Sequence, residues 1–248
     1  MRFDVSGGGE REEALRRLLR EGGHQVSFAP PWDAVILSLP FSALPEEKAP
    51  LLAPGQDVIC GRTDPAFDAL AARRGWKIHR VLKDAAYQES NALLSAEGAV
   101  YYAMSRLDFA LSDARCLVVG YGRIGRALTG MLRGLGAQVT VAARRAESRR
   151  EAGENSVSTQ EMAGILPDQD VVFNTVPCRI LGENELRHVK KDALLLEIAS
   201  APYGIDPDCA RAMGLRLCLE SGIPGRYCPR SAARLVMDYM EREGVLHA

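Results

Sequence analysis

Residues 116–145, CLVVGYGRIGRALTGMLRGLGAQVTVAARR, decide the fold of this 248-residue chain. The apolar run CLVV predicts a buried strand, and RALTGMLRGLG predicts a helix that ends at Gly136. QVTVAA predicts the next strand, so Gly120, Gly122 and Gly125 lie at the turn between a strand and a helix. This order of elements is typical of a βαβ unit that binds a dinucleotide.

Each glycine has its own task in such a turn. Gly120 permits the tight turn, Gly122 lets the backbone approach a pyrophosphate, and Gly125 lets the helix pack close to the strand. The backbone amides of Arg123 and Ile124, at the start of the helix, would then bind the phosphates. The alternative is a glycine-rich turn that binds no ligand.

The end of the second strand indicates which dinucleotide the turn would hold. An acid at this place would hydrogen-bond the adenosine ribose, but here the strand continues through Ala143 into Arg144 and Arg145. A guanidinium group binds phosphate with two parallel hydrogen bonds, so the two arginines favour the 2′-phosphate of NADP. We therefore expect NADP as the cofactor, with NAD as one alternative and a solvated basic turn as the other.

The composition argues against several classes of protein. Lys and Arg number 31 against 32 Asp and Glu, the net charge is -1, and no basic cluster indicates a nucleic-acid partner. No apolar run approaches the roughly 20 residues that span a bilayer, and the first residues lack a signal-peptide core, so we expect a cytoplasmic protein without a membrane partner. The six cysteines and four histidines show no ligand spacing, and we expect no bound metal.

Strand and helix patterns alternate along the rest of the chain and predict an α/β fold with two domains. We expect a smaller N-terminal α/β domain over residues 1–90, completed by a C-terminal helix over 229–245. Residues 91–228 would form an interdomain helix and a C-terminal Rossmann domain, a doubly wound parallel sheet that binds NAD(P). Ser95 is predicted to be the N-cap of the interdomain helix, with Glu97 in its first turn.

Several stretches together resemble the family of dipicolinate synthase A subunits, a Rossmann family related to D-2-hydroxyacid dehydrogenases. They are NALLSAEGAV (91–100), the glycine turn with GAQVTVAAR, VVFNTVPCRIL (171–181) continuing into LLLEIASAPYGID, and GIPGRYCPRSAARLV (222–236). The N-terminal domain is shorter than is usual in that family, and Arg230 stands where the family tends to carry lysine.

The resemblance implies an NADP-dependent oxidoreductase that oxidises dihydrodipicolinate, a small dicarboxylate, to dipicolinate during sporulation. It also implies a partner, the flavoprotein-like B subunit of dipicolinate synthase, and leaves a homo-oligomer as an open alternative. Such an enzyme must hold two carboxylates, place a ring carbon against the nicotinamide and accept a proton.

Loops at the carboxyl ends of the strands would supply the remaining site residues. Beyond the glycine turn and the two arginines, the residues expected to bind the cofactor are Thr175, Val176, Pro177, Ala199 and Pro224. The residues expected to bind the substrate are Asn91, Ser95, Ala96, Arg179, Gly222, Arg226 and Arg230. Among them, Ser95 and the helix N-terminus behind it would hold one carboxylate.

The expected catalytic residues are Glu97 and Asn174, although Glu97 could instead serve only to cap its helix. Two other functions stay open. A D-2-hydroxyacid dehydrogenase would need a histidine acid/base in the late loops, and no histidine lies between His188 and His247. A cofactor-binding subunit that serves a flavoprotein partner would need no acid, base or nucleophile of its own.

Overall fold

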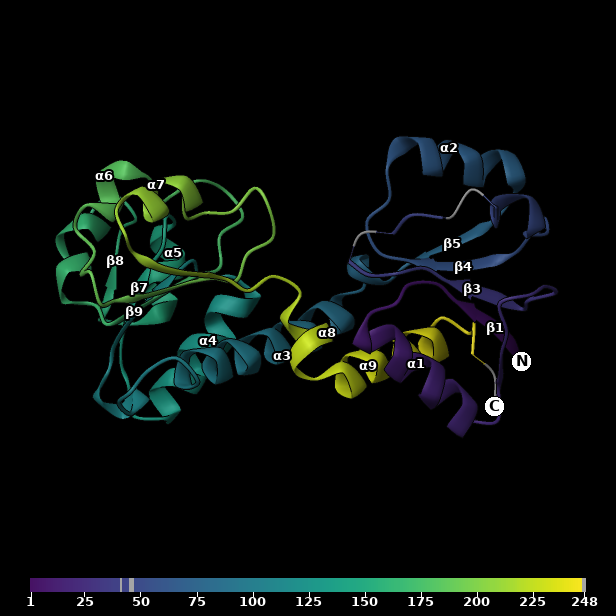
Figure 1. Ribbon diagram of the computed structural model, residues 1–248, viewed down its shortest axis with the longest axis horizontal. Coiled ribbons are helices and arrows are strands. Elements are labelled where there is room, and N and C mark those ends of the chain that lie inside the picture. Colours follow the sequence, from purple (N-terminus) through teal and green to yellow (C-terminus); the bar gives the residue numbers. More distant parts are fainter. Residues whose placement is uncertain (41, 45–46, 247–248) are drawn as a thin grey trace. The chain divides into compact units, whose positions relative to one another are not determined.

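The computed structural model describes residues 1–40, 42–44 and 47–246, which divide into two compact units (Figure 1). Unit 1 comprises Met1–Asn91 and the C-terminal segment from Pro224, and unit 2 comprises Ala92–Ile223. Each unit has a parallel sheet with helices packed on it, so the α/β fold predicted from the sequence is confirmed.

The described residues of unit 1 form a five-stranded parallel sheet in the order β2-β1-β3-β4-β5. Its strands are β1 (Arg2–Val5), β2 (Gln25–Val26), β3 (Ala34–Ile36), β4 (Asp57–Cys60) and β5 (Lys77–Arg80). The helices of this unit include α1 (Glu10–Glu21), α2 (Pro65–Arg74) and α9 (Pro229–Arg242). Because the strand order reverses beside β1, helices cover both faces of the sheet.

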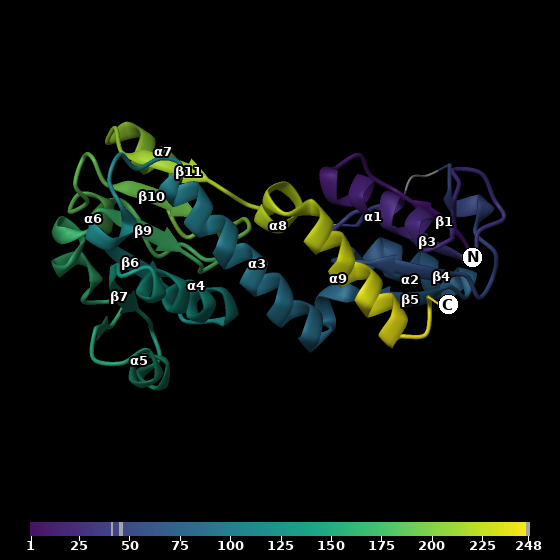
Figure 2. The same cartoon turned by 90° about the horizontal axis from the view of Figure 1, so that it is seen from below.

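Alternating side chains of these strands fill two separate cores. Phe3, Val5 and Ile36 pack with α1 and α9, which lie side by side in Figure 2. Val35 and Val58 point to the other face, where they pack with α2. The C-terminal helix is therefore part of the N-terminal unit, because its apolar stripe completes the core over α1.

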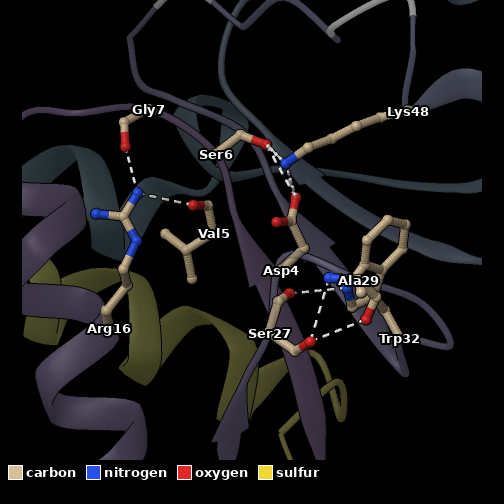
Figure 3. Close-up of polar contacts among 9 residues, drawn as sticks. All are labelled: Asp4, Val5, Ser6, Gly7, Arg16, Ser27, Ala29, Trp32 and Lys48. Carbon is tan, nitrogen blue, oxygen red and sulfur yellow. Dashed lines mark hydrogen bonds and ion pairs between the residues drawn. The ribbon is translucent and has the colours of Figure 1, made fainter.

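A charged cluster lies at β1 of this unit and at the segment that follows it. Asp4 is fully buried, and the ammonium of Lys48 lies 2.5 Å from its Oδ2 and 2.9 Å from the hydroxyl oxygen of Ser6 (Figure 3). On the other side of the strand, the Arg16 guanidinium donates hydrogen bonds to the carbonyl oxygens of Val5 and Gly7. These contacts tie the segment after β1 to both α1 and the Lys48 loop.

Unit 2 has a six-stranded parallel sheet within its described residues, in the order β11-β10-β9-β6-β7-β8. The strands are β6 (Arg115–Val119), β7 (Gln138–Ala142), β8 (Ser156–Val157), β9 (Val171–Asn174), β10 (Leu194–Glu197) and β11 (Arg216–Leu219). In Figure 1, α4 (Arg123–Gly134) lies on one face and α6 (Glu183–Leu186) and α7 (Pro207–Ala212) lie on the other. This is the strand order of a Rossmann domain, and its switch point lies between β6 and β9.

Helix α3 (Ala85–Met104) corrects one prediction made from the sequence. The helix begins at Ala85 and not at Ser95, because Asp84 caps it by accepting a hydrogen bond from the Tyr87 amide at 2.7 Å. Ser95 lies in the middle of the helix, where backbone amides are already bonded to the preceding turn. The predicted carboxylate site at a helix N-terminus beside Ser95 is therefore wrong.

Candidate nucleotide-binding site

The predicted glycine turn joins β6 to α4, at the carboxyl edge of the unit 2 sheet. Gly120 has a φ of +96°, and a Cβ there would lie 2.5 Å from the Thr175 hydroxyl. A Cβ at Gly125 would collide with the Gly120 carbonyl oxygen. Both positions therefore require glycine for reasons internal to the protein, the first for its backbone conformation and both for close packing.

Gly122 differs from the other two glycines of the turn, Gly120 and Gly125. Its φ of -82° suits any residue, and a Cβ there would meet no atom of the described chain within 4 Å. Gly122 is exposed at the N-cap of α4, whose first-turn amides point out of the helix end. The space in front of this glycine and these amides fits a pyrophosphate, since the backbone donates hydrogen bonds and the helix dipole favours an anion.

Arg144 and Arg145 follow β7 directly and are exposed. Neither guanidinium has a hydrogen-bond or ion-pair partner within the described ranges. The next helix, α5 (Ala146–Ala152), begins immediately after them. The structure thus leaves two cationic side chains available beside the end of the second strand, and the last residue of β7 is Ala142 rather than an acid.

Two buried side chains brace the loops after β9 and β10. The Asn174 side-chain amide donates to both carboxylate oxygens of Glu197, at 2.7 and 2.9 Å. Glu197 also accepts hydrogen bonds from the backbone amides of Ala199, Gly204 and Ile205, at 2.8–3.0 Å. Both side chains are fully buried, so they shape the two loops from within.

Burial raises the pKa of Glu197, and the hydrogen bonds from Ile205, Asn174, Ala199 and Gly204 act in the opposite direction. The side-chain amide nitrogen of Asn174 donates hydrogen bonds to Glu197 and, at 3.0 Å, to the Val176 carbonyl oxygen. A side chain held in this way is suited to positioning the loops after β9 and β10. These contacts favour a positioning role for Asn174 over the catalytic role expected from the sequence.

The loop after β9 lies against the glycine turn. The Thr175 hydroxyl donates to the Val119 carbonyl oxygen at 2.9 Å, and a Cβ at Gly120 would also lie 2.7 Å from the Val176 side chain. Pro177 is exposed at the tip of this loop, and Ala199 is buried at the start of the loop after β10. The structure thus brings the cofactor residues expected in unit 2 to one edge of its sheet.

The α3 residues expected at the site have different environments. Ser95 and Ala96 are buried, whereas Glu97 is exposed in the middle of the helix. Glu97 lies twelve residues after the first residue of α3, Ala85, so it cannot be a first-turn capping acid. Its carboxylate has no partner among the residues that the structure describes. One of the two roles left open for Glu97 is therefore excluded.

The remaining expected residues are distributed over both units. Arg179, in unit 2, forms an ion pair with Asp206, so its guanidinium is already engaged by a carboxylate. Gly222 has a φ of +69° near the end of the same unit. The expected residues in unit 1 are Asn91, Pro224, Arg226 and Arg230. Arg230 lies on α9, 3.9 Å from Glu21, and Arg226 lies on the short helix α8 (Ile223–Tyr227).

Two side chains of the candidate site were missed or misjudged from the sequence. Glu197 was not nominated, although an acid that ends the apolar run LLLE is a signal for a buried and fully bonded carboxylate. Arg149 follows the two arginines closely in the sequence, where its residue type suggests only a further phosphate donor. In the structure, its Nη1 instead donates to the carbonyl oxygens of Ala143 and Arg144, at 2.9 and 2.8 Å.

Residues 83–208, just over half of the chain, match the family described as the NAD binding domain of D-isomer specific 2-hydroxyacid dehydrogenases. The chain belongs to this family, and unit 2 is accordingly a nicotinamide-nucleotide domain of the dehydrogenase type. More particularly, the chain is similar to the dipicolinate synthase A subunit of Bacillus subtilis (strain 168), with 26% identity over 188 residues. The match covers 75% of this chain and 63% of that relative, so it spans less than two thirds of the relative's length.

Solved structures of two dipicolinate synthase A subunits have the same fold as this chain. The dipicolinate synthase A subunit from Bacillus halodurans has a TM-score of 0.85 and 22% identity, with 100% of this chain and 98% of that chain covered. The dipicolinate synthase A chain from Bacillus subtilis has a TM-score of 0.82 and 22% identity, with 99% and 96% covered. The resemblance stated from the sequence is confirmed by the family match, by the similarity to the Bacillus subtilis relative and by the shared fold, taken together.

The described residues lack two further features. No group of three or more His, Cys, Asp or Glu side chains among them is placed so that it could hold a metal ion. No described helix combines the length and the apolar character needed to cross a membrane.

Proposed function

We propose that the chain is an NADP-dependent oxidoreductase of the dipicolinate synthase A type, which oxidises dihydrodipicolinate to dipicolinate during sporulation. The choice of NADP as the cofactor rests on the pair of exposed arginines after β7, beside a glycine turn whose middle glycine faces open space. The substrate part is supported by the similarity to the A subunit of dipicolinate synthase.

In this proposal, the chain binds and orients the two reactants. The α4 N-terminus and Gly122 hold the pyrophosphate, and Arg144 and Arg145 hold the 2′-phosphate. The loops braced by Asn174 and Glu197 orient the nicotinamide ring, which when bound supplies the hydride acceptor. The remaining cofactor residues we propose are Gly120, Arg123, Ile124, Gly125, Thr175, Val176, Pro177, Ala199 and Pro224.

Aromatisation of the substrate requires that a proton leaves together with the hydride. We propose Glu97 as the proton acceptor, because its exposed carboxylate has neither a capping role nor a partner in the described chain. The residues proposed to bind the two substrate carboxylates are now Asn91, Arg179, Gly222, Arg226 and Arg230, since Ser95 and Ala96 are buried within α3. Arg179 would have to exchange its contact with Asp206.

The experiment that tests the proposal is an assay of the purified chain with dihydrodipicolinate and NADP, with and without the flavoprotein-like B subunit. NADPH formation by the chain alone supports the proposal. Activity that appears only with the B subunit would favour a cofactor-binding role for this chain. Turnover of 2-hydroxy acids, without turnover of dihydrodipicolinate, would favour a hydroxyacid dehydrogenase. The last outcome would be surprising, because the described histidines, His24, His79 and His188, all lie outside the loops after β9, β10 and β11.

A further inference from the structure

Arg149 closes the loop between β7 and α5. Its Nη1 lies 2.9 Å from the carbonyl oxygen of Ala143 and 2.8 Å from that of Arg144. The peptide groups of these two carbonyls link Ala143 to Arg144 and Arg144 to Arg145. The guanidinium therefore contacts the backbone on both sides of Arg144.

These two contacts determine the backbone conformation of the loop. Carbonyl groups of consecutive residues point to opposite sides in an extended strand, whereas here both point at one nitrogen. Two dipoles with their negative ends together repel each other, and a cation between them converts the repulsion into two charge-assisted hydrogen bonds. Because the peptide planes are fixed, the directions in which the Arg144 and Arg145 side chains leave the backbone are also fixed.

The helix that carries Arg149 is itself anchored. Arg126 on α4 forms an ion pair with Glu151 at 2.6 Å, and Arg133 donates to the Ala152 carbonyl oxygen at 2.9 Å. The Ser156 hydroxyl donates to the carbonyl oxygen of Arg149 at 3.0 Å. Arg149 thus projects from a helix whose position is set by its neighbours, and it can hold the loop rather than follow it.

We propose that Arg149 is a positioning residue for NADP selectivity, an inference that rests on the proposed binding of the 2′-phosphate by Arg144 and Arg145. Arg149 does not bind the phosphate in this account. It orders the two arginines before the nucleotide arrives, so that less conformational freedom is lost on binding.

The test measures NADPH and NADH binding to the full chain by fluorescence titration, in three variants. Arg149→Met removes the donor and keeps much of the aliphatic stem, Arg149→Lys restores a cation that can reach carbonyl oxygens, and Arg150→Met is the matched control. Arg150 is the next residue on α5, is exposed, and has no side-chain partner in the described chain. Its replacement therefore removes the same charge without disturbing the loop.

Arg149→Met should weaken NADPH binding about tenfold and NADH binding less than about twofold, the scale of a charge-assisted hydrogen bond. Arg149→Lys should recover most of the loss, and Arg150→Met should change both affinities by less than about twofold. Equal effects of Arg149→Met and Arg150→Met would overturn the inference, since net charge would then explain both. Equal losses of NADH and NADPH affinity would also overturn it, because they would indicate general damage to the domain.

The outcome also separates this inference from the proposed function. If replacement of Arg144 and Arg145 abolishes the preference for NADPH while Arg149→Met leaves it intact, the proposed function stands and the role of Arg149 is refuted. If the wild-type chain does not prefer NADPH at all, both are refuted.

Discussion

The side-chain amide of Asn174 donates hydrogen bonds to both carboxylate oxygens of Glu197, at 2.7 and 2.9 Å, from the ends of neighbouring central strands. Through this pair, the loop after β9 and the loop after β10 are held by one buried carboxylate that also accepts three backbone amides. The loops that face the proposed nicotinamide site are therefore set by an internal polar cluster rather than by surface contacts.

Glu197→Gln tests this cluster. An amide nitrogen in place of one carboxylate oxygen would face backbone N–H groups, so at least one buried donor loses its acceptor. We expect a loss of about 1–3 kcal/mol of stability, because a buried donor is left unsatisfied. Hydrogen exchange of unit 2 peptides measures the loss. Glu154→Gln, at an exposed position, should change stability by less than about 0.5 kcal/mol. Similar effects of the two substitutions would contradict the account.

Substitutions in the glycine turn can separate an effect on stability from an effect on nucleotide binding. Gly122→Ala adds a methyl group where no described protein atom lies within 4 Å, so stability should change by less than about 1 kcal/mol. Nucleotide affinity should fall by more than about tenfold for NADH and NADPH alike, because the methyl group occupies the proposed pyrophosphate space. Equilibrium titration and thermal unfolding measure the two effects.

Gly120→Ala is the matched comparison for Gly122→Ala. Its φ of +96° and the 2.5 Å approach of the Thr175 hydroxyl predict a loss of stability above about 1 kcal/mol. If Gly122→Ala unfolds the protein as readily as Gly120→Ala, or leaves nucleotide binding intact, the proposed pyrophosphate position is wrong.

The glycine turn could be predicted from the sequence because its signals are local. A strand, three glycines at fixed spacing and an amphipathic helix are read directly from residues 116–136, and each part matches the structure. The start of α3 was missed for the opposite reason. Both Asp84 and Ser95 are good N-caps, and the stretch between them is rich in helix-forming residues, so the pattern alone could not decide between them.

The contacts of Asn174, Glu197 and Arg149 could not be predicted from the spacing of residues in the sequence. Glu197 finds its partners in Asn174, 23 residues earlier, and in amides up to 8 residues later, which only the closed loop brings together. Arg149 contacts carbonyl groups 5 and 6 residues before it, and the direction of a carbonyl is not encoded in residue type. Residue types predicted a cluster of positive charge, whereas backbone geometry determines that Arg149 contacts carbonyl groups of the loop while Arg144 and Arg145 stay exposed.

Lys48→Met tests the buried pair in unit 1. Removing the cation leaves the fully buried Asp4 carboxylate without its counter-charge, and its Oδ1 already has no hydrogen-bond partner in the described part of the chain. We expect a loss of about 3–5 kcal/mol, the cost of an uncompensated buried charge. The two tryptophans, Trp32 and Trp76, both lie in unit 1, so their fluorescence during urea unfolding reports this unit.

The double variant with Asp4→Val and Lys48→Met should recover most of this loss, because it removes both charges together. Lys83→Met, at an exposed position of the same unit, should change stability by less than about 0.5 kcal/mol. A double variant no more stable than Lys48→Met alone would mean that the lost contacts of the lysine stem, and not the charge of Asp4, dominate.

Glu97→Gln tests the proposed proton acceptor. The substitution keeps the shape and removes the basic group, so turnover of dihydrodipicolinate should fall by about a hundredfold or more, the usual contribution of a general base. NADPH affinity and thermal stability should stay unchanged, because Glu97 is exposed and has no partner in the described residues. Turnover within a few-fold of the wild type would exclude Glu97 and leave water as the acceptor.

The most direct test of the central claim is a titration of the wild-type chain and the Arg144→Ala/Arg145→Ala variant with NADPH and NADH at low salt. A bidentate contact between guanidinium and phosphate is worth about 1.5–3 kcal/mol, which predicts at least about tenfold tighter binding of NADPH by the wild type. The variant should lose this preference and bind NADH as before, since the α4 N-terminus and Gly122 are untouched. A wild type without preference, or a variant that loses NADH as badly as NADPH, would contradict the account.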